Sequence, residues 1–448
     1  AWAADLLKPV TRTEVWSIVS SMDDKKSPGP DGYSALFFKK AWQIIGEDIF
    51  GAVAKFFSSG KLLKQINHDF IALIPKCENA NRVNLYRPIS CCNIIYKIIA
   101  KILANRLVPL LEHIIDASQA AFVKHMNMAD NVFFVQELFR KYARKRVSPR
   151  CMLKVDLHKA YDSVSWDFLN WMLLNLCFPA QFCHWVMECV STMSYSISLN
   201  GTIHGHFEGR RGLHQGDPLS PYLFVLCVEY LSRDLKSMHF NSGFNFHPSC
   251  SAQKITHLAF ADDIMLFARG DLDSVAAIFS KLDNFCSISG LKISAGKLEI
   301  FSAGIDSHLL ADLHSLTGFG SGSFPVRYLG IPLMASRLNV CHYFPLLNQI
   351  GDIIQSWNHK TILFAGRLEL IRSVIFGIVN FWLGMFPLPI LVIDRINAFC
   401  RNFLWGKSEL GKKKPLVAWK TVCAPKEEGA LGLHCLKSWN HALLARSL

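Results

Sequence analysis

The stretch His257-Leu258-Ala259-Phe260-Ala261-Asp262-Asp263-Ile264-Met265-Leu266-Phe267 decides the fold that we expect for this chain. Two short apolar runs flank a pair of adjacent aspartates. A hairpin of two strands with the acids at its turn explains this pattern, because aspartate tolerates turn geometry. An Asp-Asp turn taken alone is more often solvated surface than a catalytic site, so the surrounding sequence has to decide its meaning.

A further acid, Asp156, stands at the end of another β-prone run, residues 151–155. A strand delivers the side chain at its end to the rim of a sheet. If this strand packs beside the hairpin, three carboxylates converge, and each pair would repel by about 4 kcal/mol at ~4 Å in an effective dielectric near ~20. Such a cluster needs bound cations, and we therefore predict catalytic, metal-binding carboxylates at Asp156, Asp262 and Asp263.

The chemistry of these ligands points to the metal and to the reaction. Carboxylate oxygens suit Mg²⁺, which completes its shell with water and substrate phosphates, and Mn²⁺ is the natural substitute. Two such ions about 3.5 to 4 Å apart would stabilise the attacking 3′-hydroxyl and the departing pyrophosphate during nucleotidyl transfer. The acids alone therefore predict a nucleotidyltransferase.

Composition limits the class of protein. The 448 residues exceed one ordinary core, so two or three lobes are expected. Hydrophobic residues make up 51% and charged residues 19%, which argues against a disordered chain. The net charge of +13 favours a polyanionic partner, either nucleic acid or an acidic membrane.

The fourteen cysteines are scattered and include no C-x-x-C pair, which fits a reducing compartment. Loose, unequal spacing separates a late group of Cys and His residues, and we assign no metal there because buried thiols explain it equally well. The members of this group are Cys423, His434, Cys435 and His441.

An apolar series of roughly bilayer-crossing length runs over residues 374–393. Pro387 and Pro389 would end a helix there, so we expect two amphipathic helices that meet at a proline turn and no membrane span. The chain begins with Ala1 and opens with no signal peptide, so we expect an intracellular piece of a longer product.

The rest of the chain shows mainly helical patterns, with one further strand. Residues 11–60 are helical around a turn at 27–32, residues 70–75 form a strand, and the pattern after residue 333 is mostly helical. Residues 93–111 form an amphipathic helix. Its polar side is expected to offer phosphates three basic residues: Lys97, Lys101 and Arg106.

A cationic run, residues 140–146, should end a helix and begin a loop before the next strand. Two interpretations stay open for its charges, a solvated helix end or a phosphate contact.

With these elements in hand, the chain resembles reverse transcriptases of non-LTR retrotransposons, most closely the LINE-type elements of plants. The resemblance covers nearly the whole chain, and the joint occurrence of its motifs in one order makes it specific. The stretches that carry it are Lys26-Ser27-Pro28-Gly29-Pro30-Asp31-Gly32, Leu73-Ile74-Pro75-Lys76, Tyr86-Arg87-Pro88-Ile89-Ser90, residues 156–162, Gln215-Gly216-Asp217-Pro218-Leu219-Ser220-Pro221, Phe260-Ala261-Asp262-Asp263 and Tyr328-Leu329-Gly330.

The resemblance implies an α+β, right-hand polymerase fold with fingers, a palm built on an antiparallel sheet and a helical thumb. Residues 1–56 would be a helical extension, 57–335 the reverse transcriptase domain and 336–448 the thumb with a C-terminal extension. The implied activity is RNA-directed DNA synthesis, with an RNA template, a DNA primer and deoxynucleoside triphosphates as partners. The implied place of action is the nucleus.

The same resemblance implies roles around the incoming nucleotide. Lys76 and Arg87 would bind its triphosphate, which suits a point charge and a bidentate guanidinium, although surface solvation is the alternative. Tyr161 would be the steric gate that excludes a 2′-hydroxyl, and filling of the core is the alternative for this ring.

Further roles concern the template and the primer. Gln215 and Gly216 would approach the templating base and the nucleotide, because glycine lets the backbone come close. Lys297 resembles a lysine that protonates pyrophosphate, with a solvated position as the alternative. Three residues resemble the primer grip: Tyr328, Leu329 and Gly330.

Three positions depart from the family pattern. Met126 stands where a basic residue is usual, His214 where Arg is common, and Ser294 where Asn is common. Retrotransposon copies decay, so a catalytically inactive relic that only binds nucleic acid is the alternative function. The predicted carboxylates and nucleotide contacts are all present, which favours an active polymerase.

Overall fold

The computed structural model describes residues 2–77, 79–144, 146–240, 243–294, 296, 298–358, 361–406 and 416–446. The chain forms two compact units, each assembled from separate segments. Residues 1–126 and 148–321 make the first unit, and residues 127–147 and 322–448 make the second. Helices and sheets are mixed in the first unit, and the expected α+β class is confirmed.

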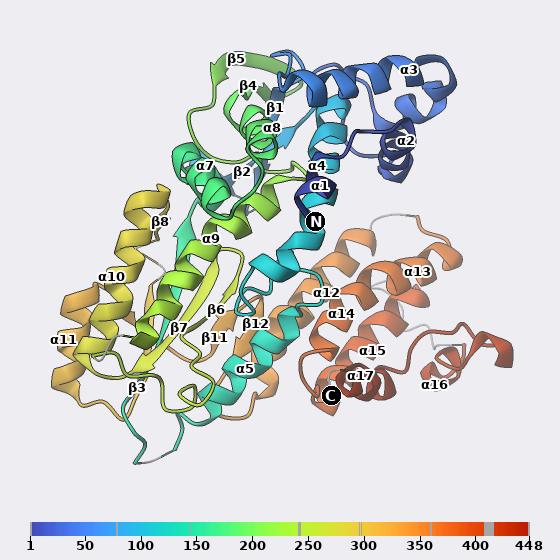
Figure 1. Cartoon of the computed structure of the whole chain (residues 1–448). Coiled ribbons are helices and arrows are strands. Elements are labelled where there is room, and N and C mark those ends of the chain that lie inside the picture. The colour runs from blue at the N-terminus through green and yellow to red at the C-terminus, as the bar shows by residue number, and fades with distance from the viewer. Residues whose placement is uncertain are drawn as a thin grey trace. The chain divides into compact units, whose positions relative to one another are not determined.

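A six-stranded sheet forms the centre of the first unit, in the order β10-β9-β3-β7-β6 with β8 beside β3. Strand β3 runs antiparallel to β7 on one side and to β9 on the other. Helices α9 and α10 cover one face of this sheet, and α11 packs on α10 (Figure 1). The bounds are β3 (Arg150–His158), β6 (His257–Phe260), β7 (Asp263–Arg269), β8 (Lys292–Ile293), β9 (Glu299–Ala303), β10 (Gly320–Ser321), α9 (Ser220–Ser237), α10 (Leu272–Ser289) and α11 (Ser307–Thr317).

The apolar runs recognised in the sequence form the buried strands of this sheet. The expected strand at 151–155 lies within β3, and the expected hairpin at 257–267 is the β6–β7 pair. Both are confirmed. Strand β3 is buried along nearly its whole length because it has a neighbour on each side and helices over the sheet, which explains why its residues are mostly apolar apart from Lys154.

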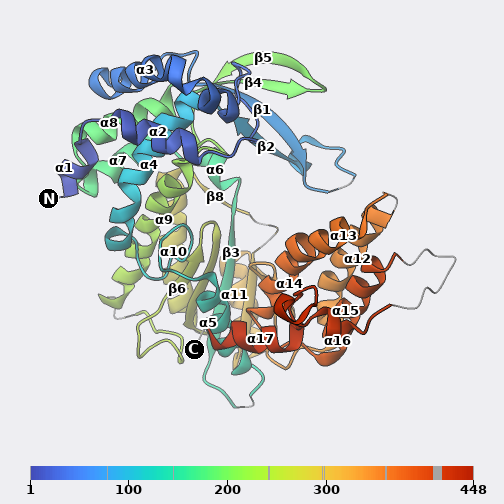
Figure 2. The same cartoon turned by 90° about the vertical axis from the view of Figure 1, so that its right-hand side faces the viewer.

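A second sheet of the first unit has the order β2-β1-β4-β5, and Figure 2 shows β1 and β2 extending from it as a pair. The expected strand at 70–75 lies within β1. The bounds are β1 (His68–Pro75), β2 (Tyr86–Cys91), β4 (Ser194–Leu199) and β5 (Thr202–Glu208). The helices of this region are α1 (Trp2–Leu7), α2 (Arg12–Ser21), α3 (Ala35–Ser59), α4 (Ile94–Ile114), α6 (Ala160–Ser163), α7 (Trp166–Asn175) and α8 (Ala180–Ser191).

Helix α4 confirms the predicted helix at 93–111 but corrects one expectation about its basic side. Lys97 and Lys101 are partly exposed, whereas Arg106 is only 6% exposed. The guanidinium of Arg106 lies 3.1 Å from a carboxylate oxygen of Glu14 and donates a hydrogen bond to the carbonyl of Leu6. Helices α1 and α2 therefore cover this end of α4, and Arg106 is not offered to phosphates.

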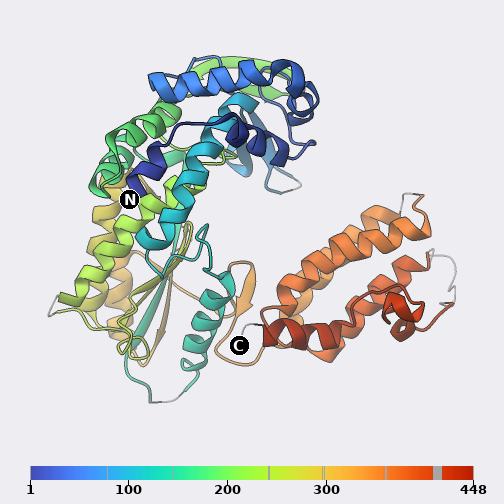
Figure 3. The same ribbon diagram turned by 45° about the vertical axis from the view of Figure 1, so that its right-hand side comes forward.

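The second unit consists of α5, a short β-hairpin and a group of helices. Figure 3 draws this group of helices in orange to red and α5 in teal. Helix α5 belongs here through Gln136, whose side chain exchanges two hydrogen bonds with the backbone of Met334, at 2.8 and 3.3 Å. The bounds are α5 (Met128–Arg140), β11 (Val326–Tyr328), β12 (Ile331–Leu333), α12 (Phe344–Asn358), α13 (Phe364–Leu370), a π-helical turn (Ile371–Ile375), α14 (Phe376–Leu383), α15 (Ile390–Leu404), α16 (Trp419–Val422) and α17 (Leu436–Ala445).

Two predictions that fall near this unit are confirmed. Helix α5 ends at Arg140 and strand β3 begins at Arg150, so the cationic run does end a helix. The apolar series 374–393 is split between α14 and α15, with Pro387 and Pro389 between them. No helix among the described residues is both long and apolar enough to cross a membrane.

Candidate functional site

Strand pairing brings the three predicted carboxylates to one place. The β3–β7 register sets Asp156 directly opposite Asp263, and the β6–β7 register pairs Phe260 with Asp263. Ala261 and Asp262 therefore form a two-residue turn. Directly opposed residues have Cβ atoms roughly 4.5 to 5.5 Å apart on one face of a sheet, so Asp156 and Asp263 are neighbours.

This acidic cluster, Asp156 with Asp262 and Asp263, has the donor chemistry of a hard-cation site. Its ligand atoms are all carboxylate oxygens, which Mg²⁺ and Mn²⁺ prefer. All three side chains are partly exposed, so water and substrate phosphates can reach them. The residues present therefore fit a divalent cation that shares its coordination shell with a substrate.

The turn of the hairpin is held by a residue that the sequence patterns did not single out, Gln119. The turn residues are Ala261 and Asp262 rather than the expected pair Asp262 and Asp263, and Ala261 has a φ of +54°. Its N–H donates to the side-chain oxygen of Gln119 at 3.0 Å, and Gln119 is 1% exposed. Ala120 donates its N–H to the carbonyl of Ala259 at 3.0 Å, and Ala259 donates its N–H to the carbonyl of Ser118 at 2.8 Å, which adds to this support. No pattern in the sequence predicted this contact between Gln119 and the turn.

Tyr161 lies close to the acidic cluster. It sits on α6, directly after β3, and its ring stacks on Phe224 with centroids 5.0 Å apart. Burial raises the pKa of Tyr161 to about 12, and the negative charge of Asp262 adds to the shift. The phenol is therefore protonated at neutral pH and lies within electrostatic reach of Asp262.

The two predicted triphosphate contacts are exposed residues of the β1–β2 region. Lys76 donates to the carbonyl of Asn84 at 2.9 Å, and Arg87 lies on β2 opposite Ile74. Burial raises the pKa of Asp162, and the positive charges of Lys159 and Lys76 oppose that shift. Lys76 is thus electrostatically coupled to the α6 region that carries Tyr161.

The segment of Gln215 and Gly216 lies between this α6 region and strand β2. Leu213 donates its N–H to the carbonyl of Tyr161 at 2.7 Å, and Ser90 donates its N–H to the carbonyl of Gln215 at 2.9 Å. Gly216 has a φ of +121°, and a Cβ there would lie 3.1 Å from the Ser90 carbonyl oxygen. Glycine is required at this close approach.

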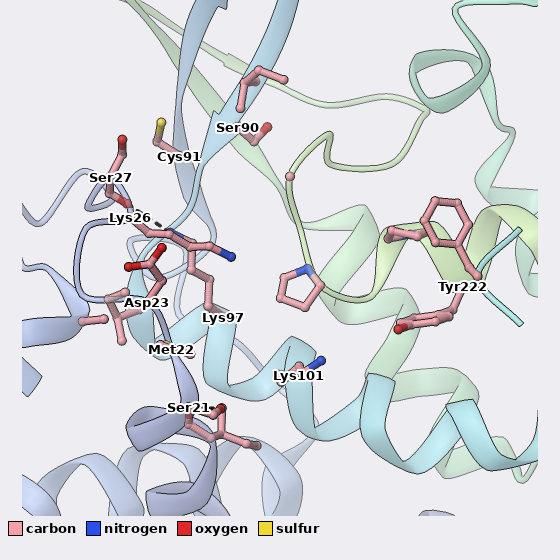
Figure 4. Close-up of a pocket in the computed structure, with 18 residues that line it drawn as sticks. Ser21, Met22, Asp23, Lys26, Ser27, Ser90, Cys91, Lys97, Lys101 and Tyr222 are labelled. Carbon is pink, nitrogen blue, oxygen red and sulfur yellow. Dashed lines mark hydrogen bonds between the residues drawn. The ribbon is translucent and has the colours of Figure 1, made fainter. Parts of the chain in front are cut away.

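A cavity of about 730 Å³ opens beside Gly216 (Figure 4). Three lysines lie along it, and Tyr222 lies on the opposite side with Phe122, their ring centroids 6.4 Å apart. These lysines are Lys26, Lys97 and Lys101. The sequence located each basic residue but not their convergence, because they come from separate elements. The cavity combines positive charge with aromatic faces, which is the surface that single-stranded nucleic acid prefers.

The structure places the remaining residues named in the sequence analysis at different positions relative to the acidic cluster. The amide of Ser294 donates to the carbonyl of Asp156 at 2.9 Å, whereas Lys297 lies outside the described residues. Tyr328 is buried, and Leu329 and Gly330, with φ of +49° and +83°, form the turn between β11 and β12. This hairpin belongs to the second unit, whereas the acidic cluster belongs to the first.

A buried polar group was missed by the sequence patterns. Asp69, Cys92 and His214 are at most 1% exposed, and their potential ligand atoms lie within 4.8 Å of one another. His214 was noted only as a departure from a family pattern, and no local signal pointed to Asp69 or Cys92.

Comparison with known proteins agrees with this geometry. Residues 74–333 match the family model described as reverse transcriptase (RNA-dependent DNA polymerase). The chain is 25% identical over 443 residues to the transposon TX1 uncharacterized 149 kDa protein of Xenopus laevis, an alignment that covers 97% of this chain and 32% of that protein. It is 27% identical over 446 residues to the retrovirus-related Pol polyprotein from the type-2 retrotransposable element R2DM of Drosophila melanogaster, covering 94% of this chain and 40% of that protein.

A shorter match links the chain to a plant sequence. It is 44% identical over 66 residues to an uncharacterized mitochondrial protein of Arabidopsis thaliana, covering 14% of this chain and 54% of that protein. The chain thus spans a third to two fifths of the length of the long transposon relatives and carries one part of what they contain.

Proposed function

The chain belongs to the reverse transcriptase family, and on that premise we propose that it is the RNA-directed DNA polymerase of a non-LTR retrotransposon. It would add deoxynucleotides to the 3′-hydroxyl of a primer along an RNA template. The observation that carries this proposal is the strand register that sets Asp156 opposite Asp263, with Asp262 in the adjoining turn.

The acidic cluster would hold two Mg²⁺ ions, with Asp156 and Asp262 as the main ligands and Asp263 completing the set. When bound, two such ions stabilise the charge that develops on the attacking and departing oxygens of an in-line phosphoryl transfer. The carboxylates would position the reactants by orienting the triphosphate and the primer end around a fixed point of the sheet.

Residues around the cluster would bind and select the nucleotide. Lys76 and Arg87 would neutralise the triphosphate, and Lys297 would donate a proton to the pyrophosphate. Tyr161, supported by its stacking on Phe224, would stand where a 2′-hydroxyl projects and so favour deoxynucleotides. Gln215 and Gly216 would contact the new base pair.

The cavity of Figure 4 supports a place for the template. Lys26, Lys97 and Lys101 would follow the phosphates of a single strand, and the rings of Phe122 and Tyr222 would stack with its bases. The cavity reaches Gly216, so the template would enter beside the new base pair.

The primer and the domain assignment remain part of the proposal. Tyr328, Leu329 and Gly330 would grip the primer. Residues 57–335 would form the fingers and palm after a helical extension at 1–56, and residues 336–448 would form the thumb with its extension. A plant LINE-type origin and action in the nucleus are also part of the proposal, and the Arabidopsis thaliana match adds to it only a likeness to one plant sequence.

Primer extension on an RNA template tests this function. We expect extension that depends on Mg²⁺ and deoxynucleotides, and we expect Asp262→Asn to abolish it while template binding persists. Asp273→Asn is the matched control, because Asp273 is an exposed acid at the first turn of α10, beyond the far end of β7. If the native chain binds template in a salt-sensitive way but makes no DNA, the inactive relic is the correct function.

A further inference from the structure

A buried ion pair joins the segment of Gln215 to strand β1. His214 Nδ1 lies 2.8 Å from a carboxylate oxygen of Asp69, and the two side chains are 1% and 0% exposed. Water cannot compensate either group at this depth. A buried carboxylate is tolerated when a cation or several hydrogen bonds compensate it, and here the imidazole is the nearest cation.

The groups that face this pair come from every element packed around it. The Cys92 thiol donates to Asp69 of β1 at 3.2 Å, and the ring of Tyr96 of α4 stacks on His214 with centroids 5.3 Å apart. The other groups are Tyr195 of β4, Cys189 of α8 and Asp217. His214 is the buried basic member of this set, two members are carboxylates, and the partly exposed Lys97 of α4 acts through its charge on the Cys92 thiol. The surroundings therefore favour an imidazolium.

The pKa shifts agree with this geometry. Burial alone would lower the pKa of His214, but the charges of Asp69 and Asp217, with the hydrogen bond to Asp69, raise it above its ordinary value. Burial raises the pKa of Asp217, and the charge of His214 opposes that shift.

Hydrogen bonding leaves the pair with little other compensation. Asp69 Oδ1 and His214 Nε2 have no hydrogen-bond partner among the described residues. Loss of one proton from the imidazolium, from the unpartnered Nε2, would keep the Nδ1–H bond to Asp69 but would remove the positive charge that compensates this carboxylate.

The backbone on either side of His214 is tied to the parts of the candidate site. Leu213 is hydrogen-bonded to Tyr161, and Gln215 to Ser90 of β2. His214 lies between these two bonds and sends its side chain into the core toward β1. Its position sets where the backbone of Gln215 and Gly216 runs.

We propose that His214 is a positioning residue, whose imidazolium is held by Asp69 and fixes the Gln215–Gly216 segment against the β1–β2 sheet. What that segment contacts, the template and the nucleotide, rests on the proposed function. The pair acts on substrate binding through this segment and touches no substrate itself. Above the pKa of His214 the charge part of this fixation is lost, and the neutral Nδ1–H bond to Asp69 holds the segment more weakly.

Thermal unfolding between about pH 6 and about pH 9 tests the pair without any activity. His214 has a raised pKa in the folded state, so its contribution is complete below the unfolded pKa of about 6.5 and is lost as pH rises through the folded pKa. The native chain should lose melting temperature over this range. Asp69→Asn/His214→Gln, which replaces the ion pair by two neutral amides, should lose less. An equal loss in both chains overturns the proposal.

Matched variants separate this pair from a general effect of a buried histidine. His257 is also buried but bonds to the hydroxyls of Ser118, Ser232 and Thr256, so His257→Gln should keep the alkaline loss. Purified protein should also carry no stoichiometric zinc. Zinc that disappears in His214→Gln would make the three buried residues metal ligands and overturn the ion pair.

Steady-state primer extension tests the positioning role. His214→Gln should raise KM for the deoxynucleotide by about tenfold with a smaller change in kcat, because misplacement of a binding segment weakens substrate orientation. In the native chain the same KM should rise with pH, and in the double variant it should not. A fall in kcat alone contradicts positioning. If no chain makes DNA, the proposed function fails, and the unfolding series still decides the ion pair.

Discussion

Two groups of carboxylates in the first unit differ in their burial and in the cations that can compensate their negative charge. Asp156, Asp262 and Asp263 are partly exposed at the end of a sheet, where water and dissolved cations can reach their carboxylates. Asp69 and Asp217 are 0% and 4% exposed and share a histidine. Under the proposed function the first group binds cations from solution, whereas the cation of the second group is the side chain of His214. Removing a charge should therefore have opposite effects on stability and activity in the two places.

The largest expected effect comes from Asp156→Asn. Loss of several kcal/mol of transition-state stabilisation should lower primer extension by about 10³-fold. The melting temperature without added metal should stay the same or rise, because repulsion within the acidic cluster is relieved. A clear fall in melting temperature would remove the contrast between the two groups.

The next effect tests an inward charge on helix α4. Arg106→Met should cost about 3 kcal/mol of unfolding free energy, because it leaves Glu14 without its buried partner. Urea unfolding measures this loss. The double variant Arg106→Met/Glu14→Leu should recover most of it, and template affinity should stay unchanged in both. A loss of template binding in folded Arg106→Met would make Arg106 a phosphate contact after all.

The third effect concerns His257, a buried histidine whose pKa is shifted in the opposite direction to that of His214. Burial lowers the pKa of His257 from 6.5 to about 4. A depressed folded pKa gives stability that is complete above the unfolded value and is lost as pH falls through the folded one. The native chain should thus lose on the order of 3 kcal/mol between pH 6.5 and about pH 4 from this group.

His257→Gln should flatten that acid limb in urea unfolding. The alkaline limb assigned to His214 should be unaffected. An unchanged acid limb would mean that His257 is not held neutral by its hydroxyl neighbours.

The smallest effect concerns an outward cation of the same helix α4. Lys101→Ala should weaken template binding by a few-fold and lower the slope of log affinity against log salt by about one. Stability should change by less than about 0.5 kcal/mol. Fluorescence anisotropy with a labelled RNA strand at several salt concentrations measures this. An unchanged salt slope would place the template elsewhere.

The outward-facing groups were the ones that sequence could predict. Asp156 and the Asp262–Asp263 pair each end a mostly apolar run, and a buried strand that stops at an acid leaves a local pattern. The β6–β7 hairpin, helix α4 and the break at Pro387 follow from equally local signals.

The inward-facing groups left no such pattern. Asp69 lies on β1, which pairs with β4, and His214 lies in the segment after β5 that runs beside β2. Strand pairing brings the two residues together, and no spacing in the sequence predicts their contact. Arg106 has the period of a polar helix face, but α1 and α2 cover it. Gln119 had no local signal in the sequence, yet its side chain holds the turn at Ala261. Tertiary packing decides each of these.

The assembly of the second unit from two distant segments has a consequence for synthesis on the ribosome. Helix α5 waits for its partner at Met334, which lies 198 residues farther along the chain. At roughly 5 to 20 residues per second, that delay is about 10 to 40 s. During this time the apolar side of α5, including Phe139, has not yet met Phe324. A nascent chain stalled before that point should attract chaperones that bind exposed apolar helices.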